Sequence, residues 1–337
     1  MIPAGRHSRQ ERFAPIGASG QAKIAASTAV VVGCGALGTV AAEQLARAGI
    51  GRLRLIDRDL VEPSNLQRQS LFSEADAAAC RPKAEAASAR LQQIAAGVII
   101  EPLVADAQPS NVAALIAGAQ VVIDGADNFP TRHLVNEACC RAGIPFAVGA
   151  CVGAYGLSLT VLPGVTACLR CVQSELPAAG DGPTCDTQGI IAPAVHLVAA
   201  WQVAEALKIL VGDLGAVRRE LWAGDLWSNR FQRISLTKAK DPSCLVCGRQ
   251  ATFPLLTAGD DPAVVLCGRD AIQVRCGPVN LETLGKTLGN TVMISSEHLV
   301  RWQADGITGT CFRDGRVLVQ GVSTPAAARG FCARWLG

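Results

Sequence analysis

The chain has 337 residues, enough for two domains of ordinary size, and half of its residues are hydrophobic. Only 18% of the residues are charged and the formal net charge is +3, which predicts a globular protein without a polybasic surface for nucleic acid. The first ten residues lack the apolar segment of a signal peptide, and the most apolar stretch, 190–211, contains polar and charged residues at helical spacing. We therefore expect no membrane span and a cytoplasmic location.

The first predicted strand, 29–32, ends in a glycine-rich turn, and a helical pattern follows directly. The turn has glycine at three positions: Gly33, Gly35 and Gly38. Glycines allow close approach of a phosphate, and a helix N-terminus offers free N–H groups and partial positive charge. The next strand pattern ends at Asp57, whose carboxylate is placed to accept hydrogen bonds from both hydroxyls of a ribose. These features predict a nucleotide site, although such a turn can also serve close packing alone.

Strand and helix patterns continue to alternate after this turn. In order, we predict a helix at 82–94, a strand at 98–104, a short helix at 112–116, a strand at 121–124, a helix at 131–142, strands at 146–148 and 157–162, a long loop at 164–189, a helix at 190–211, and strand-like runs around Leu221 and at 231–236. This alternation predicts an α/β fold of Rossmann type, with a doubly wound, mostly parallel sheet and helices on both faces. Ligands of such sheets bind at the carboxyl ends of the strands.

A second unit is predicted beyond the nucleotide-binding part. Strand patterns lie at 264–267, 272–275, 292–295 and 316–319, and helical patterns at 281–288 and 325–335. We assign residues 1–250 to the nucleotide-binding domain and residues 251–337 to a small α/β domain without an assigned role.

Fourteen cysteines and the absence of a secretion signal indicate a reducing compartment, where paired cysteines more often bind metal than form disulfides. Two C-x-x-C pairs, Cys168/Cys171 and Cys244/Cys247, together offer four thiolates for one tetrahedral ion. They predict a closed structural zinc site. Free thiols, a redox-active pair and a nucleic-acid-binding zinc ribbon are the alternatives, and few basic residues surround the pairs to support the last of these.

Several separated segments resemble the ThiF/MoeB/HesA adenylyltransferases, which are relatives of the ubiquitin-activating enzymes. In chain order within about residues 6–250, the matching segments are 6–10, the glycine turn, 57–59, 64–69, 81–83, 124–128, 131–132, the two C-x-x-C pairs and 184–185. Ala36 stands where the family commonly has a further glycine, and a bound phosphate should tolerate that methyl group.

The resemblance implies an ATP- and Mg²⁺-dependent reaction. Such enzymes adenylylate the C-terminal Gly-Gly carboxylate of a ubiquitin-like sulfur carrier protein of the ThiS/MoaD type, release pyrophosphate and prime thiocarboxylate formation. Thiamine biosynthesis is slightly favoured over molybdopterin or specialised sulfur pathways. Residues 251–337 show no rhodanese-like cysteine loop, so we expect sulfur to come from a separate donor such as a cysteine desulfurase.

The resemblance also implies roles for individual residues. Arg68 and Lys83 would supply cations, Asn65 would hydrogen-bond near the phosphates, Asp57 would bind the ribose and Asp127 would hold Mg²⁺. Taken singly, each has an ordinary alternative, because Lys and Arg are usually solvated and Asp and Asn often stabilise turns.

Two further roles involve residues outside the predicted strand ends. Arg9 would be supplied to the site by the second subunit of a homodimer, and Cys185, in the long loop, would take part in sulfur transfer after adenylylation. A thiol without a catalytic role is an equal alternative for Cys185. The rival functions are a nicotinamide-dependent oxidoreductase, which leaves Arg68, Lys83 and the cysteine pairs unexplained, and a non-catalytic partner subunit.

Overall fold

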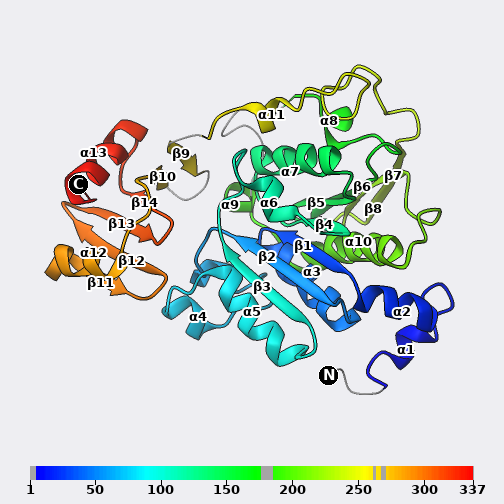
Figure 1. Cartoon of the computed structure of the whole chain (residues 1–337), viewed down its shortest axis with the longest axis horizontal. Coiled ribbons are helices and arrows are strands. Elements are labelled where there is room, and N and C mark those ends of the chain that lie inside the picture. Colours follow the sequence, from blue (N-terminus) through cyan, green and yellow to red (C-terminus); the bar gives the residue numbers. More distant parts are fainter. Residues whose placement is uncertain (1–4, 176–184, 261–262, 267–270, 337) are drawn as a thin grey trace. The chain divides into compact units, whose positions relative to one another are not determined.

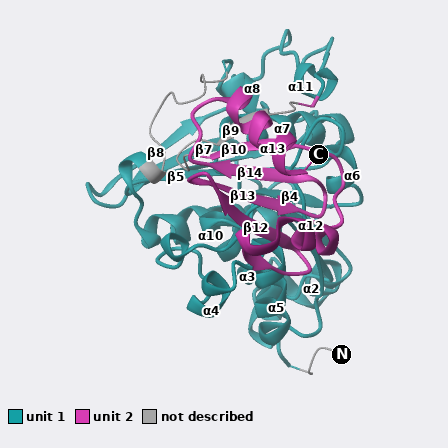
Figure 2. Cartoon of the chain, turned by 90° about the vertical axis from the view of Figure 1, so that its left-hand side faces the viewer, with its two compact units in different colours: residues 1–177, 183–259 teal, residues 178–182, 260–337 magenta. Residues whose placement is uncertain are grey.

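The computed structural model describes residues 5–175, 185–260, 263–266 and 271–336. The chain forms two compact units, which Figure 2 distinguishes by colour: unit 1 comprises residues 1–177 and 183–259, and unit 2 comprises residues 178–182 and 260–337. The division therefore falls after Gly259, whereas the sequence places the boundary after residue 250.

Unit 1 contains one eight-stranded sheet in the order β3-β2-β1-β4-β5-β6-β7-β8. The first five strands in this order are parallel and the last three run antiparallel to their neighbours. The strands are β1 (Thr28–Val32), β2 (Arg52–Asp57), β3 (Ile99–Val104), β4 (Val121–Asp124), β5 (Phe146–Val152), β6 (Tyr155–Val161), β7 (Glu220–Asp225) and β8 (Arg230–Ser235). The predicted mostly parallel sheet is confirmed, with an antiparallel extension on one side.

Helices cover both faces of this sheet because β1 and its neighbours are apolar on both sides (Figure 1). One face packs against α2 (Gly17–Ala25), α3 (Ala36–Ala48), α5 (Lys83–Ile94) and α10 (Ala192–Val211). The other packs against α6 (Val112–Ile116), α7 (Phe129–Ala142), α8 (Leu169–Val172) and α11 (Pro254–Thr257). Shorter helices are α1 (Ser8–Glu11), the 3₁₀ turn η1 (Pro63–Asn65), α4 (Glu74–Ala78) and α9 (Cys185–Gln188).

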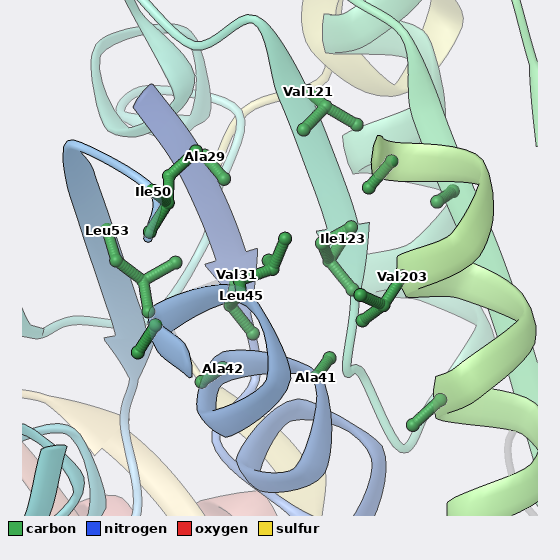
Figure 3. Packing of buried hydrophobic residues seen from close by; sticks show 14 of the residues in the cluster. Ala29, Val31, Ala41, Ala42, Leu45, Ile50, Leu53, Val121, Ile123 and Val203 are labelled. Carbon is green, nitrogen blue, oxygen red and sulfur yellow. The ribbon is translucent and has the colours of Figure 1, made fainter. Parts of the chain in front are cut away.

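Alternation along β1 separates the two cores. Ala29 and Val31 belong to the core that α3 and α10 cover, and Figure 3 shows Val31 beside Leu45 and Ala29 near Ile50. Val30 and Val32 belong to the core on the opposite face. The glycine turn follows immediately, so the packing of β1 on both sides fixes where that turn emerges from the sheet.

The apolar helix α10 is, among the described residues, the one helix long and apolar enough to cross a membrane by length and composition. Slightly more than half of its apolar window is buried inside the protein, and Val195, Val198 and Ala199 on this helix belong to the core. This burial is typical of a core helix.

Unit 2 contains a six-stranded sheet in the order β11-β12-β13-β14-β10-β9, antiparallel throughout. Its elements are β9 (Ala263–Leu266), β10 (Ala271–Arg275), α12 (Leu281–Leu288), η2 (Gly289–Thr291), β11 (Val292–Ser295), β12 (Leu299–Ala304), β13 (Ile307–Phe312), β14 (Arg316–Gln320) and α13 (Pro325–Leu336). The core of unit 2 lies between one face of the sheet and helices α12 and α13, with Trp302 stacked on Phe331.

The sequence patterns predicted both helices of unit 2 but missed β12 and β13. These strands form a hairpin across Asp305 and Gly306, both of which have positive φ angles of 53° and 77°. An Asp-Gly pair between apolar runs is a strong hairpin signal. The sequence therefore carried the information for this hairpin.

Candidate nucleotide and zinc sites

The three glycines of the turn have different structural roles. Gly33 has φ +91°, and a Cβ there would lie 2.4 Å from the Gly125 carbonyl oxygen. A Cβ on Gly38 would lie 1.8 Å from the Gly33 carbonyl oxygen. These two glycines are thus required by packing within the protein. A Cβ on Gly35 would meet nothing closer than 3.9 Å, the distance to Gln69 Nε2 and to the Gly125 oxygen. The space in front of Gly35, at the N-terminus of α3, fits close approach of a phosphate.

Asp57, the last residue of the neighbouring strand β2, binds the backbone of the glycine turn. Its carboxylate accepts hydrogen bonds from the Cys34 N–H (2.6 Å) and the Asp59 N–H (2.7 Å), and the residue is only 7% exposed. Burial raises the pKa of Asp57, and the nearby Lys83 ammonium opposes that shift. Asp57 therefore fixes the backbone of the turn, and its remaining lone pairs are the acceptors that a ribose would require.

Lys83 lies at the start of α5 and is 3% exposed. Its Nζ is 3.6 Å from a carboxylate oxygen of Asp59, and its backbone N–H donates to the Asp59 carbonyl. A buried ammonium beside the glycine turn gives the site positive charge in a poorly hydrated place, where charge acts strongly on an anionic ligand.

The segment around η1 contributes a third side of the site. The Asn65 side chain is buried and accepts from the Glu62 N–H (3.1 Å), so its oxygen stabilises this loop. Arg68 is half-buried and donates to the Ser64 carbonyl oxygen (2.9 Å). Gln69 is buried beside Gly35, and its Oε1 has no hydrogen-bond partner among the described residues. Gln69 was not among the predicted site residues and is an acceptor or donor available to a ligand.

The turn after β4 carries Asp127 next to the glycine turn. Asp127 is exposed and accepts from Asn128 Nδ2 (3.0 Å), while Asn128 Oδ1 caps α7 by accepting from the Thr131 N–H (2.9 Å). Asp127 belongs to no preformed group of metal-binding side chains in the described parts of the chain. A single exposed carboxylate suits Mg²⁺, which usually keeps several waters and binds through one or two carboxylates plus phosphates.

Arg132 and Gln202 hold this turn in place. Arg132 donates through Nε to the Asp124 carboxylate and through Nη2 to the carbonyl oxygens of Ala126 (2.7 Å) and Gly149 (3.1 Å). Gln202 Nε2 donates to the Asp124 carbonyl oxygen (2.8 Å). Asp124 is 1% exposed, and burial raises its pKa while Arg132 opposes the shift. The network is a clamp that ties the carboxyl end of β4 to the first half of β5.

We predict that replacing Arg132 destabilises this clamp. Arg132→Ala leaves Asp124 buried without its ion-pair partner, which should lower the free energy of unfolding by about 3–5 kcal/mol. Arg132→Lys keeps the charge but loses the bonds to both carbonyl oxygens, because a lysine lacks the planar fork, and should cost less. Denaturant unfolding of the two variants tests this order; equal stability of the Ala variant and the wild type would contradict it.

Arg9 lies far from the glycine turn of its own chain. It is exposed on α1, and the neighbouring Gln10 donates to the carbonyl oxygen of Ala48, the last residue of α3 (3.0 Å). The glycine turn is at the other end of that 13-residue helix, about 20 Å away at 1.5 Å per residue. Helices α1 and α2 lie at the periphery of unit 1 (Figure 1). The structure thus brings Asp57, Lys83 and the turn that carries Asp127 to the glycine turn, but leaves Arg9 outside this group.

The four C-x-x-C cysteines converge although the pairs are remote in sequence. Their sulfur atoms all lie within 4.8 Å of one another, with 3.7 Å between Cys168 and Cys244 and 3.3 Å between Cys171 and Cys247. Four sulfurs at about 2.3 Å from a tetrahedral zinc ion would be roughly 3.8 Å apart. Burial raises the pKa of the Cys171 thiol to about 11, so four thiolates here require a cation. The donor set and its geometry fit one zinc ion.

The remaining predicted residue is Cys185. Its backbone begins α9, shortly before α10, but its side chain lies outside the described residues.

A turn with room for phosphate at a strand–helix junction, an acid after the next strand and a four-cysteine cluster define a nucleotide-binding protein with a metal-binding clip. Residues 7–246 match the model of the ThiF family. The chain belongs to this family.

Three relatives place the chain within the family. It is 44% identical over 339 residues, and 99% of both chains, to the sulfur carrier protein ThiS adenylyltransferase of Bacillus subtilis. It is 37% identical to the SAMP-activating enzyme E1 of Haloferax volcanii, over 72% of this chain and 88% of the relative. It is 33% identical to the sulfur carrier protein adenylyltransferase of Thermus thermophilus, over 73% of this chain and 92% of the relative.

Solved structures support the fold. A crystal structure of E. coli MccB with succinimide aligns with a TM-score of 0.63 at 23% identity, covering 74% of this chain and 75% of that chain. At this identity the likeness concerns the fold alone.

Proposed function

We propose that this chain is an adenylyltransferase that activates the C-terminal Gly-Gly carboxylate of a ubiquitin-like sulfur carrier protein, consuming ATP and releasing pyrophosphate. The observation that carries the proposal is the 44% identity to a ThiS adenylyltransferase along 99% of both chains. The space at Gly35, with Asp57 and Lys83 beside it, supplies the nucleotide site that this reaction needs. The same relative favours a carrier of the ThiS type and thus thiamine biosynthesis over molybdopterin synthesis.

The arrangement addresses the main difficulty of the reaction. A carboxylate that attacks the α-phosphate meets like-charge repulsion, so the site must compensate charge and orient both reactants. Lys83 is buried near Asp57, and Arg68 is half-buried in the segment after η1. Asp57, which binds the Cys34 N–H, would accept from the ribose. Mg²⁺, held by Asp127, would compensate charge on the phosphates. Asn65 would act mainly by shaping the loop that carries Arg68.

The proposal is tested directly on the carrier. The protein is incubated with MgATP and a carrier ending in Gly-Gly, and the carrier is analysed by mass spectrometry. We expect the added mass of one adenylyl group, and no addition to a control carrier that lacks the last glycine. Unmodified carrier in both reactions, with pyrophosphate absent, would refute the proposal. Subsequent thiocarboxylate formation would need a separate sulfur donor, such as a cytoplasmic cysteine desulfurase.

We further propose a homodimer in which Arg9 of one subunit completes the site of the other. The support is the position of Arg9 at the end of α3 remote from the glycine turn of its own chain. Arg9→Ala and Asp127→Ala should each be inactive alone. Mixing and refolding the two variants should restore part of the activity, because a hybrid dimer has one intact site. A fully active monomer in sedimentation experiments would contradict this arrangement.

Cys185 is proposed to act after adenylylation, in sulfur transfer. The support is its place in the segment before α10, close in the chain to Ile190, which forms a β-bridge with Gly153. Cys185→Ser should leave ATP–pyrophosphate exchange unchanged and sharply lower thiocarboxylate formation on the carrier. Thiocarboxylate formed at the wild-type rate would mean that an external persulfide attacks the adenylate without Cys185.

A further inference from the structure

One buried amide side chain at the glycine turn, that of Gln69, is not explained by the stability of the fold. Gln69 is only 4% exposed, and its Oε1 is buried without a hydrogen-bond partner among the described residues. Most buried side-chain polar atoms have such a partner, because an unpaired one lowers the stability of the folded state. A hydrophobic side chain of similar size would therefore suit this position better if packing were its only purpose.

The donor end of the Gln69 amide lies at the space in front of Gly35. Its Nε2 is 3.9 Å from the place that a Cβ on Gly35 would occupy, and in the described part of the chain, neighbouring residues aside, the Gly125 carbonyl oxygen is the other atom within 4 Å of that place. Gly35 is also the N-cap of α3, whose first N–H groups have no partner within the helix. An anion in this space would meet both the helix N-terminus and the amide donor.

The loop that carries Gln69 is held in place by its backbone and by the core. The Gln69 N–H donates to the Asn65 carbonyl oxygen (3.0 Å), and the Gln69 carbonyl oxygen accepts from the Phe72 N–H (3.3 Å). Leu71 is 3% exposed and belongs to the core that α3 and α5 cover. The backbone of Gln69 is thus positioned before a ligand binds, which lowers the entropic cost of using its side chain.

The neighbouring acid indicates which phosphate of ATP would occupy this space. Asp57, the residue proposed for the ribose, accepts from the N–H of Cys34 (2.6 Å), and Cys34 directly precedes Gly35. The α-phosphate is the phosphate that is bonded to the ribose. A ribose at Asp57 therefore favours the α-phosphate for the space in front of Gly35.

We propose that Gln69 is a further substrate-binding residue, which donates a hydrogen bond from Nε2 to an oxygen of the ATP α-phosphate. This inference rests on the proposed adenylylation and names a contact at its reacting centre. In that reaction a carboxylate oxygen of the carrier bonds to the α-phosphorus, the bond to the bridging oxygen breaks, and pyrophosphate leaves with the electron pair of that bond. A neutral donor fixed at the α-phosphate would stabilise the negative charge on its oxygens during the attack.

Replacement by methionine separates a ligand contact from a structural role. Gln69→Met keeps the length of the side chain but removes both amide atoms, including the buried Oε1 that has no described partner. Without ligand, the variant should therefore unfold at the same temperature as the wild type or at a higher one. A glutamine that serves only the fold would give the opposite result, a lower melting temperature.

Binding is measured by calorimetry without carrier, with adenosine, AMP and MgATP as ligands. Gln69→Met should bind AMP and MgATP about tenfold to a hundredfold more weakly than the wild type, as expected for the loss of one hydrogen bond to a charged group. Its affinity for adenosine, which has no phosphate, should be unchanged. Gln69→Glu replaces the donor by a negative charge and should weaken AMP binding further. Gln92→Met makes the same change as Gln69→Met at an exposed position of α5 and should bind all three ligands like the wild type.

The three ligands distinguish the possible failures. If Gln69→Met binds AMP and MgATP like the wild type, or if it loses affinity for adenosine to the same extent, the role of Gln69 is overturned and adenylylation is not. Weaker binding of MgATP with unchanged binding of AMP would overturn the assignment to the α-phosphate. A wild type that binds neither AMP nor MgATP would refute the proposed function itself.

Discussion

Asp127→Ala should lower the rate of adenylate formation by about a thousandfold, because a bound metal ion contributes several kcal/mol to such transition states and each 1.4 kcal/mol is a factor of ten. The side chain is exposed and accepts a hydrogen bond from Asn128 Nδ2, whereas Asn128 caps α7 through a different atom, Oδ1. The fold should therefore remain intact, with a free energy of unfolding within about 0.5 kcal/mol of the wild type.

Two further variants are compared with Asp127→Ala. Asp127→Asn keeps the size of the side chain but removes its charge and should be nearly as inactive. Glu282→Ala removes an exposed acid from unit 2, where it pairs with Lys286, and should be fully active. Pyrophosphate exchange and thermal unfolding are measured on each protein. Normal exchange by Asp127→Ala would show that the metal is held elsewhere.

Removal of zinc should have the largest effect on stability. The cluster joins the loop after β6 to the segment after β8, two parts of unit 1 that are remote in sequence. Structural zinc sites contribute on the order of 10 kcal/mol to folding. If about half of that is lost in Cys247→Ser, the melting temperature should fall by roughly 10–20 °C. Cys80→Ser, which removes a partly exposed cysteine outside the cluster, should change it little.

Metal analysis accompanies the unfolding experiment. We expect one zinc ion per chain in the wild type and in Cys80→Ser, and none retained in Cys247→Ser after dialysis against a chelator. If the chelator-treated wild type contains no zinc but unfolds at the same temperature as the untreated wild type, a structural metal site is contradicted.

The sequence predicted the parallel sheet well, because its apolar runs and helical patterns alternate strictly. It also predicted Asp57, whose carboxylate binds the glycine turn, but not Gln69, which lies beside Gly35. It could not distinguish the glycine that leaves space for a ligand from those required by packing. Gly33 and Gly38 avoid clashes with main-chain oxygens, and for Gly33 the oxygen belongs to Gly125, nearly a hundred residues away. Such contacts depend on the assembled fold.

The clamp of Arg132 and Gln202 was missed for a related reason. Four of the five acceptors described for these two side chains are main-chain carbonyl oxygens, at Asp124, Ala126, Ala147 and Gly149, and sequence patterns do not mark such acceptors. A weak signal existed, since Gln202 is a polar residue in the middle of an apolar helix and is fully buried. A buried side-chain amide requires hydrogen-bond partners, so Gln202 in this apolar helix indicated a buried hydrogen-bond network.

If the isolated chain adenylylates a carrier protein, it should catalyse ATP–pyrophosphate exchange that depends on the carrier. The purified protein is given ATP, Mg²⁺ and labelled pyrophosphate, with and without a ubiquitin-like carrier ending in Gly-Gly. We predict that label enters ATP only when the carrier is present and its C-terminal glycine is intact. No exchange with the carrier, together with specific binding and reduction of a nicotinamide dinucleotide, would contradict it.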